Sequence, residues 1–256
     1  MNQSAGTPQP PPNSLPRFPG GTSVSHLCVY DWETPDGLHG GSPHLHTLST
    51  EAYVVTAGQG AVQTISSEGP AEDTLQPGSL LWFTPGTIHR LINEANLELV
   101  VVMQNAGLPE AGDAVLTFPE EILADPQKYQ QAVALPTEGP EEKRAEAARR
   151  RRDLAIEGQQ QILEAFNAGN GPEHMRRLWR QATALVTPKI PHWRQIWSAN
   201  VEAQAELTRR QLTALENGNG EHLGQSQVIR GAPRPGPRLF GMCGRLQTWK
   251  AEDFTA

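Results

Sequence analysis

The stretch from His44 to Asn93 decides the fold of this chain. It combines three histidines, one glutamate and a set of turn residues, namely Pro43-His44-Leu45-His46, Glu51, Gly58, Gly78, Pro85-Gly86, His89 and Asn93. Side chains alternate between the two faces of a strand, so His44 and His46 point to the same side. The pattern predicts short strands that carry polar side chains toward one site.

Two further strands are expected to bring the remaining polar groups to the same place. Glu51 begins a strand with Tyr53 and Val55 on its face, and His89 begins another with Leu91 and Asn93. If these strands line one barrel, three imidazoles and a carboxylate converge. We therefore predict a site for one divalent metal ion (Fe, Mn, Ni or Zn) with four ligands, His44, His46, Glu51 and His89. The predicted pocket residues are Tyr53, Val55, Leu91 and Asn93.

These residues resemble the two motifs of the cupin family. The first motif has a glycine, His-x-His, a glutamate and a glycine, here Gly37, His44, His46, Glu51 and Gly58. The second has a glycine, Pro-Gly, a histidine and an asparagine, here Gly78, Pro85-Gly86, His89 and Asn93. One residue more than usual separates Gly37 from His44 and Gly78 from Pro85. The resemblance covers residues 25–105 and implies a small antiparallel barrel or jelly roll; surface histidines on an ordinary β-sandwich are the alternative.

The composition along the chain divides it into segments. The fold class expected is a cupin-type antiparallel β-barrel or jelly roll followed by a C-terminal bundle of helices. We expect a disordered proline-rich segment (1–22), the barrel (23–107), a connecting segment with short helices (108–139), a helical extension (140–220), and a Pro/Gly connector with a C-terminal strand (221–256).

Three local patterns make finer predictions about the strands. Ala57-Gly58-Gln59-Gly60 predicts a tight hairpin turn. Leu97–Met103 is strongly apolar and predicts a strand buried on both faces. Leu239–Lys250 predicts one late strand that joins its own sheet or that of a neighbouring subunit.

Apolar stripes in the second half predict helices that pack on each other and on the outside of the sheet. The first stripe is Leu154, Gly158, Ile162 and Phe166, and later stripes run through Trp193 to Leu215. A tryptophan-lined groove is the alternative. The run Arg149–Arg152 fans around a helix and predicts a solvated cluster.

Charge and composition narrow the classes of partner. The net charge of −7 divides into −12 over residues 1–139 and +5 over residues 140–256. No concentrated basic face with interleaved aromatic residues is present, so nucleic-acid binding is not expected. No apolar run reaches membrane-spanning length and no signal peptide is seen, so we expect a cytoplasmic protein without membrane contact. Because the cytoplasm keeps thiols reduced, we expect Cys28 and Cys243 to be two free thiols, with a disulfide between them as the alternative.

The site predicts chemistry on a small molecule. Three neutral imidazoles and a carboxylate leave a divalent metal with one net positive charge and open positions. The resemblance to cupin dioxygenases implies that Glu51 acts as a ligand or as a general base. None of the predicted pocket residues is cationic, which favours a largely uncharged substrate. We expect a metal-dependent enzyme, dioxygenase-like in the first place and an isomerase or lyase in the second; the alternative is a non-catalytic metal- or ligand-binding cupin that acts as an interaction or regulatory module. A homodimer is also expected, because the apolar strands would be buried against a second copy of the chain.

Overall fold

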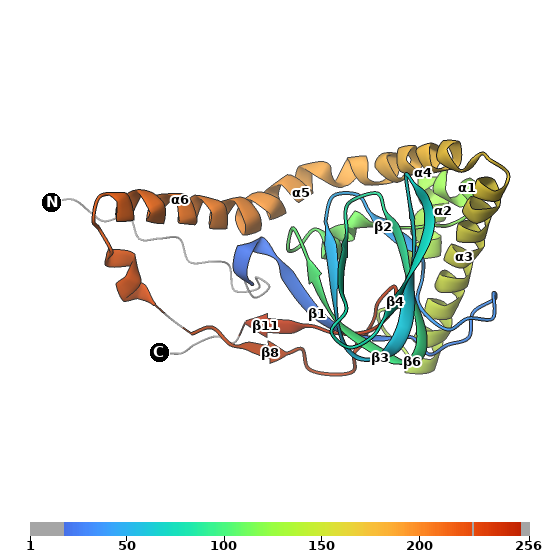
Figure 1. Cartoon of the computed structure of the whole chain (residues 1–256), viewed down its shortest axis with the longest axis horizontal. Coiled ribbons are helices and arrows are strands. Elements are labelled where there is room, and N and C mark those ends of the chain that lie inside the picture. The colour runs from blue at the N-terminus through green and yellow to red at the C-terminus, as the bar shows by residue number, and fades with distance from the viewer. Residues whose placement is uncertain (1–17, 227, 252–256) are drawn as a thin grey trace.

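The computed structural model describes residues 18–226 and 228–251. Most of the predicted proline-rich segment, residues 1–17, lies outside the described residues. A nine-stranded antiparallel sheet curls into a barrel, with the helices over one side of it (Figure 1). Its strands are β1 (Ser23–Val29), β2 (His44–His46), β3 (Glu51–Ser66), β4 (Gly69–Leu75), β5 (Leu80–Phe83), β6 (Ile88–Met103), β7 (Ala114–Leu116), β9 (Leu239–Phe240) and β10 (Gly244–Gln247). The barrel and the C-terminal helices confirm the predicted fold class.

The order of the strands follows from their hydrogen-bonded pairs. The main path is β4-β3-β6-β1-β10-β9, while β2 pairs with β6 and β7, and β5 pairs with β3. Strand alternation fills the barrel interior with apolar side chains such as Tyr53, Leu91 and Leu99, each almost wholly buried. On β6 the alternation leaves Val100 and Val102 partly exposed, so the prediction that both faces of Leu97–Met103 are buried is wrong.

No hairpin turn forms at Ala57–Gly60, and this prediction is also wrong. β3 runs through these residues, and its pairing with β6 shifts register three times between Val55 and Gly60. Gly58 has a φ of 75°, and a Cβ there would lie 2.1 Å from the carbonyl oxygen of Asn96. The glycine therefore marks a bulge where two backbones approach closely, which a sequence pattern does not separate from a turn.

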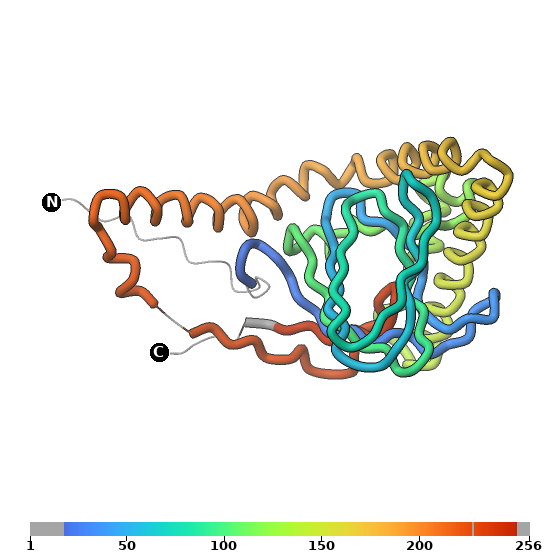
Figure 2. Tube along the Cα trace, viewed as in Figure 1, coloured from blue at the N-terminus to red at the C-terminus, as the bar shows by residue number. Residues whose placement is uncertain are grey.

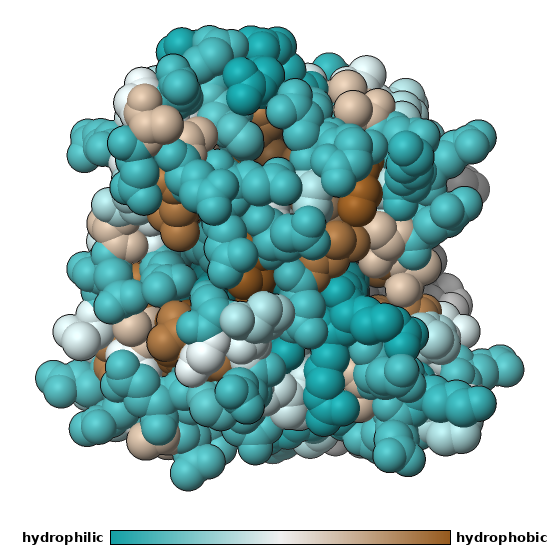
Figure 3. Space-filling model, turned by 90° about the vertical axis from the view of Figure 1, so that its right-hand side faces the viewer, coloured by the Kyte–Doolittle hydropathy of each residue, from teal (hydrophilic) through white to brown (hydrophobic). Residues whose placement is uncertain are grey.

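The helices cover one side of the barrel, as the tube in Figure 2 shows for the yellow and light orange segments. The covering helices are α1 (Glu120–Leu123), α2 (Pro126–Val133), α3 (Glu141–Asn167), α4 (Gly171–Val186) and α5 (Ile190–Trp197), and α6 (Ala203–Glu216) continues beyond them. α3 lies so close to the barrel that a Cβ on Gly158 would be 1.9 Å from the carbonyl oxygen of Thr117. The outward face of the helical layer is mainly hydrophilic, with small scattered apolar patches (Figure 3).

The predicted packing of helices on the sheet is confirmed for α3, α4 and α5. Their buried side chains share one apolar core with residues of the barrel: Leu45, Ile65, Ile88, Ala155, Ile162, Met175, Leu178 and Trp193 are among its members. Each fully buried large aliphatic side chain contributes about 1.5–3 kcal/mol to folding. Trp193 belongs to this core and donates to the carbonyl oxygen of Ala111 (3.2 Å), so it lines no groove.

α6 departs from the predicted packing. It continues from α5 away from the barrel (Figure 1), and none of its residues is buried. Leu207, Leu212 and Leu215 are exposed along it. The apolar side chains of α6, which were expected to pack on the sheet, are therefore left exposed within the described part of the chain.

The arginine run of α3 is not a solvated cluster. Arg151 is 9 % exposed and Arg152 is 2 % exposed, whereas Arg150 is exposed and pairs with Glu146. Arg149 lies over the ring of Trp32, 4.3 Å from its centroid. Four consecutive helical residues fan over all faces, so two of them necessarily turn toward the barrel.

The C-terminal part forms two pairs of strands in place of the one predicted strand. β9 and β10 make a hairpin, and β10 joins the chain's own sheet through β1. β11 (Trp249–Ala251) pairs instead with β8 (Gly231–Pro233), inside the predicted connector. The turn at Gly241–Gly244 separates the two short strands of the hairpin, with the amide of Gly241 bonded to the carbonyl oxygen of Gly244 (2.8 Å).

Cys28 and Cys243 are both free thiols, as expected. Among the described helices, none is both long enough and apolar enough to cross a lipid bilayer.

Candidate metal centre

Four side chains from three strands converge inside the barrel. His44 and His46 come from β2, His89 stands opposite His44 on β6, and Glu51 begins β3. Each offers a ligand atom, and these atoms all lie within 4.8 Å of one another. Oε2 of Glu51 is 2.9 Å from Nε2 of His46 and 2.9 Å from Nε2 of His89. The structure therefore brings together the four side chains predicted as ligands.

The second nitrogen of each imidazole faces an oxygen acceptor. Nδ1 of His44 lies 3.0 Å from the carbonyl oxygen of Ser42, and Nδ1 of His89 lies 3.2 Å from that of Thr87. Nδ1 of His46 lies 3.3 Å from Oδ2 of Asp113. An acceptor at Nδ1 holds the ring proton there and directs the Nε2 lone pair to the other side. All three rings are thus oriented as Nε2 ligands.

Three buried atoms of these four side chains have no hydrogen-bond partner. One is Nδ1 of His46, whose contact with Asp113 is an ion pair, and the other two point to the centre. Nε2 of His89 and Oε2 of Glu51 are buried without a hydrogen-bond partner, although they are close together. Ligands about 2.1 Å from one metal ion and at right angles to each other stand roughly 3 Å apart. The observed spacing and the unpaired atoms fit a divalent ion, and the mixed nitrogen and oxygen donors suit Fe, Mn, Ni or Zn.

The pKa values of the four groups reflect their burial and mutual charge. Burial, followed by the charges of His89 and His46, holds the pKa of His44 well below its usual value. Burial alone would raise the pKa of Glu51, but the charge of His89 and the close imidazoles of His46 and His89 hold it well below its usual range. Burial would lower the pKa of His46, yet Asp113 and Glu51 raise it to about 9. Metal binding therefore requires the loss of a proton from His46.

Asp113 supports this site, although nothing in the sequence pointed to it. The side chain is wholly buried. Its carboxylate accepts from the amides of Thr47 (3.0 Å), Leu48 (2.8 Å) and Ser49 (2.9 Å), and from the hydroxyl of Thr47 (2.6 Å). Asp113 thereby fixes both the loop after β2 and the ring of His46. It belongs to neither motif, and no local pattern relates it to a histidine 67 positions earlier in the chain.

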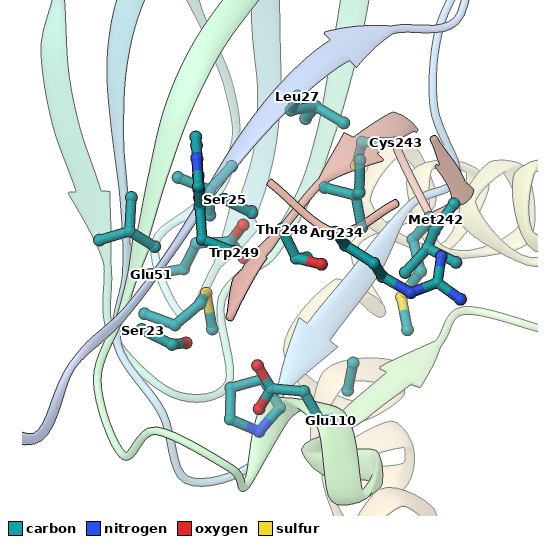
Figure 4. Close-up of a pocket in the computed structure, with 18 of the residues that line it drawn as sticks. Ser23, Ser25, Leu27, Glu51, Glu110, Arg234, Met242, Cys243, Thr248 and Trp249 are labelled. Carbon is teal, nitrogen blue, oxygen red and sulfur yellow. The ribbon is translucent and has the colours of Figure 1, made fainter. Parts of the chain in front are cut away.

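A cavity of about 1110 Å³ opens beside the four side chains. His44, His46 and Glu51 reach its wall, which otherwise consists mainly of apolar residues from β1, β6 and the C-terminal segment: Leu27, Val101, Met103, Leu239, Phe240, Met242, Leu246 and Trp249 are among them. Figure 4 shows Glu51 on one side of this space, with Met242 and Cys243 on the other. The buried thiol of Cys243 has its pKa raised to about 12 by burial and stays protonated.

The four predicted pocket residues do not line this cavity. Tyr53, Val55 and Leu91 belong to the core of the barrel. The amide nitrogen of Asn93 donates to the carbonyl oxygen of Val29 (3.1 Å), and its oxygen accepts from the amide of Leu97 (2.9 Å). They occupy the inward face, as alternation requires, but the cavity extends from Glu51 toward the opposite end of the strands.

Cationic groups line the cavity, which the sequence analysis did not expect. Arg151 comes from α3 and Arg234 from the C-terminal segment. Both lie far from the motifs in sequence. Arg90 turns away from the site, as alternation predicts, and donates to Asp36 (2.6 Å).

Comparison with known proteins identifies the fold. Residues 31–104 match the family model described as a cupin domain. No curated protein matches the chain. Among solved structures, a Streptomyces PAC13 variant with uridine is 18 % identical, covering 39 % of this chain and 70 % of that one, with a TM-score of 0.30. A Klebsiella pneumoniae conserved protein with a double-stranded β-helix domain is 16 % identical over 42 % of this chain and 84 % of that one (TM-score 0.29). An oxalate oxidase in complex with the substrate analogue glycolate is 21 % identical, covering 34 % of this chain and 51 % of that one, with a TM-score of 0.24.

Proposed function

We propose that this chain, whose residues 31–104 match the cupin domain model, binds one divalent metal ion and acts as a metal-dependent enzyme on a small organic molecule. The proposed ligands are His44, His46, Glu51 and His89. The observation that carries the proposal is the common orientation of the three imidazoles, each with Nδ1 facing an oxygen acceptor and Nε2 directed inward. A histidine cluster with a purely structural role has no need of this arrangement.

The metal, when bound, supplies a Lewis acid with positions open to substrate. The chain itself supplies the environment. The apolar wall excludes water and receives the body of the substrate. Glu51 is the carboxylate among the four proposed ligands, and it is the group placed to accept a proton from a bound substrate. This role favours a dioxygenase-like reaction on an enolic or phenolic compound, with isomerase or lyase chemistry as the second class.

A non-catalytic binding protein is the second candidate function. The exposed leucines of α6 favour it, because an uncovered apolar helix suits an interaction module. Both candidates require the metal site, but only the first predicts turnover.

Metal analysis of protein purified without chelator tests the proposal. We expect about one metal ion per chain, and loss of that metal in His89→Ala and Glu51→Gln. The exposed His192 on α5 provides the control, so His192→Ala should keep its metal. A wild-type protein that contains no metal and takes up none of Fe, Mn, Ni or Zn would refute the proposed centre. Oxygen uptake over a panel of enolic and phenolic compounds then separates the two candidates.

A further inference from the structure

Among the residues that the structure describes, three arginine side chains are buried, and two of these three have a carboxylate partner. Arg90 pairs with Asp36 (2.6 Å), and Arg152 pairs with Asp153 (2.7 Å). Arg151 forms no ion pair within residues 18–226 and 228–251. Burying a guanidinium without a counter-charge destabilises a fold, so the position of Arg151 needs a structural or functional reason.

The contacts of Arg151 satisfy only part of its guanidinium. Nη2 donates to the carbonyl oxygen of Gly241 (2.8 Å), which also accepts from the hydroxyl of Tyr30 (3.0 Å). Nη1 is 3.5 Å from the carbonyl oxygen of Val133, and Nε is buried without a partner. Arg152 differs at Nε, which donates to Oδ1 of Asp153 (2.9 Å). The neighbours of Arg151 are therefore neutral and leave its charge uncompensated.

Arg151 lies on the wall of the same cavity as the four-ligand centre. The turn that it contacts through Gly241 also carries Cys243, whose Sγ is 4.0 Å from Nδ1 of His44. The other charged groups on the wall outside the centre are Glu110 and Arg234, and both are exposed. Glu110 is engaged with the amide of Gly107 (3.0 Å). A single buried cation thus stands in a largely apolar cavity that opens onto the centre.

We propose that Arg151 binds the carboxylate of a small organic acid whose other end reaches the metal ligands. The proposal rests on the proposed function, since it assigns the substrate class of that site. One guanidinium balances one negative charge, which suits a carboxylate, whereas a phosphate carries more negative charge than one guanidinium balances. The apolar wall formed by residues such as Leu27, Met242 and Leu246 receives the remainder of the molecule.

Calorimetric binding of benzoate, its neutral analogue benzamide and inorganic phosphate tests this assignment. The three probes are titrated into full-length protein, both depleted of metal and loaded with manganese. We expect benzoate to bind at least about tenfold more tightly than benzamide in both forms, since hydrogen bonds to charged groups contribute about 1.5–3 kcal/mol. Arg151→Gln should abolish this preference, and Arg151→Lys should keep part of it. Arg150→Gln, one residue away but exposed, is the matched control and should behave as wild type.

Each other outcome overturns the assignment. Equal binding of benzoate and benzamide by the wild type, or an unchanged preference in Arg151→Gln, excludes an anion anchor at this residue. Tighter binding of phosphate excludes the carboxylate. If Arg151→Gln does not fold, the wild-type preference and the Arg151→Lys variant decide the question. The metal-depleted protein distinguishes a failure of this proposal from a failure of the proposed metal centre. In that protein the preference for benzoate over benzamide depends on Arg151 and not on a bound ion.

Discussion

Oδ2 of Asp113 lies 3.3 Å from Nδ1 of His46, while Nε2 of the same ring lies 2.9 Å from Glu51. One imidazole is thus held between a supporting carboxylate and a ligand carboxylate. Such supporting groups fix the ring orientation and raise the basicity of the ligand nitrogen.

Asp113→Asn is expected to weaken metal binding by about 10–100-fold. The amide keeps the shape of the side chain but removes the negative charge beside His46. Competition with a chelator of known affinity measures the change. Glu110→Gln, three residues earlier in the chain, is the control and should leave the affinity unaltered; equal affinities in all three proteins would contradict the supporting role.

The ion pair of Asp36 and Arg90 predicts a pH-dependent contribution to stability. Burial alone would raise the pKa of Asp36, but hydrogen bonds from Arg90 and Thr34 lower it from 3.8 to about 2. A carboxyl group with a lowered pKa stabilises the fold fully above its unfolded value and loses that effect as the pH falls through the folded value. The contribution is therefore present above about pH 5 and lost between about pH 4 and pH 2.

Asp36→Asn should lower the free energy of unfolding by about 2–4 kcal/mol at pH 7, because Arg90 stays buried without its partner. The difference from wild type should shrink as the pH falls from about 4 to 2. Urea denaturation of metal-free protein across this range gives the comparison, with the exposed Asp31→Asn as control. A difference that is constant with pH would show that the charge of Asp36 is not the cause.

Gly158→Ala should strongly destabilise the protein. The added Cβ meets the backbone oxygen of Thr117, and overpacking of this kind costs about 1–3 kcal/mol or more. Gly224→Ala is the matched control, since nothing lies within 4 Å of a Cβ there. Thermal unfolding of the two variants measures the effect; equal midpoints would mean that α3 can move away from the barrel at little cost.

The helices α3 to α5 are expected to unfold together with the barrel in one cooperative transition. Leu45, Ile65 and Ile88 of the barrel share their core with those helices, so a fragment of residues 1–139 loses their cover. We expect this fragment to be insoluble or to lack a cooperative transition. A soluble fragment that binds metal and melts like the full chain would instead make the helices an independent appendage.

Homodimer formation is expected through the outer face of the barrel. Val54, Leu80 and Trp82 are exposed and adjacent there, since β3 and β5 pair Val54 with Leu80 and Ala52 with Trp82. Light scattering at micromolar concentration should give the mass of a dimer, and Trp82→Glu should reduce it to that of a monomer. Leu223→Glu, in the segment after α6, controls for the added charge. A monomeric wild type would disprove the prediction.

The four ligands of the centre were predictable from sequence because they lie within two short motifs, whereas Asp113 lies outside both. Strand alternation places His44 and His46 on one face, and short spacings relate them to Glu51. The cavity was not predictable in this way. Arg151 contacts a carbonyl 90 residues later in the chain, and Cys243 lies beside a histidine 199 residues earlier. Such contacts depend on how the C-terminal segment folds back, which no periodicity encodes.

The bulge at Gly58 shows a different reason for error. A glycine with positive φ serves equally in a turn and in a bulge, so Ala57–Gly60 fits both. The length of β3 decides between them, and that length is set by pairing with β6.

The β9–β10 hairpin closes the cavity with residues from the end of the chain. On the ribosome, His44, His46, Glu51 and His89 emerge long before Leu239 to Gln247, and so does Arg151. The wall of the cavity therefore stays incomplete until the hairpin has been made, and the enclosure of the centre is the last part of the fold to be completed.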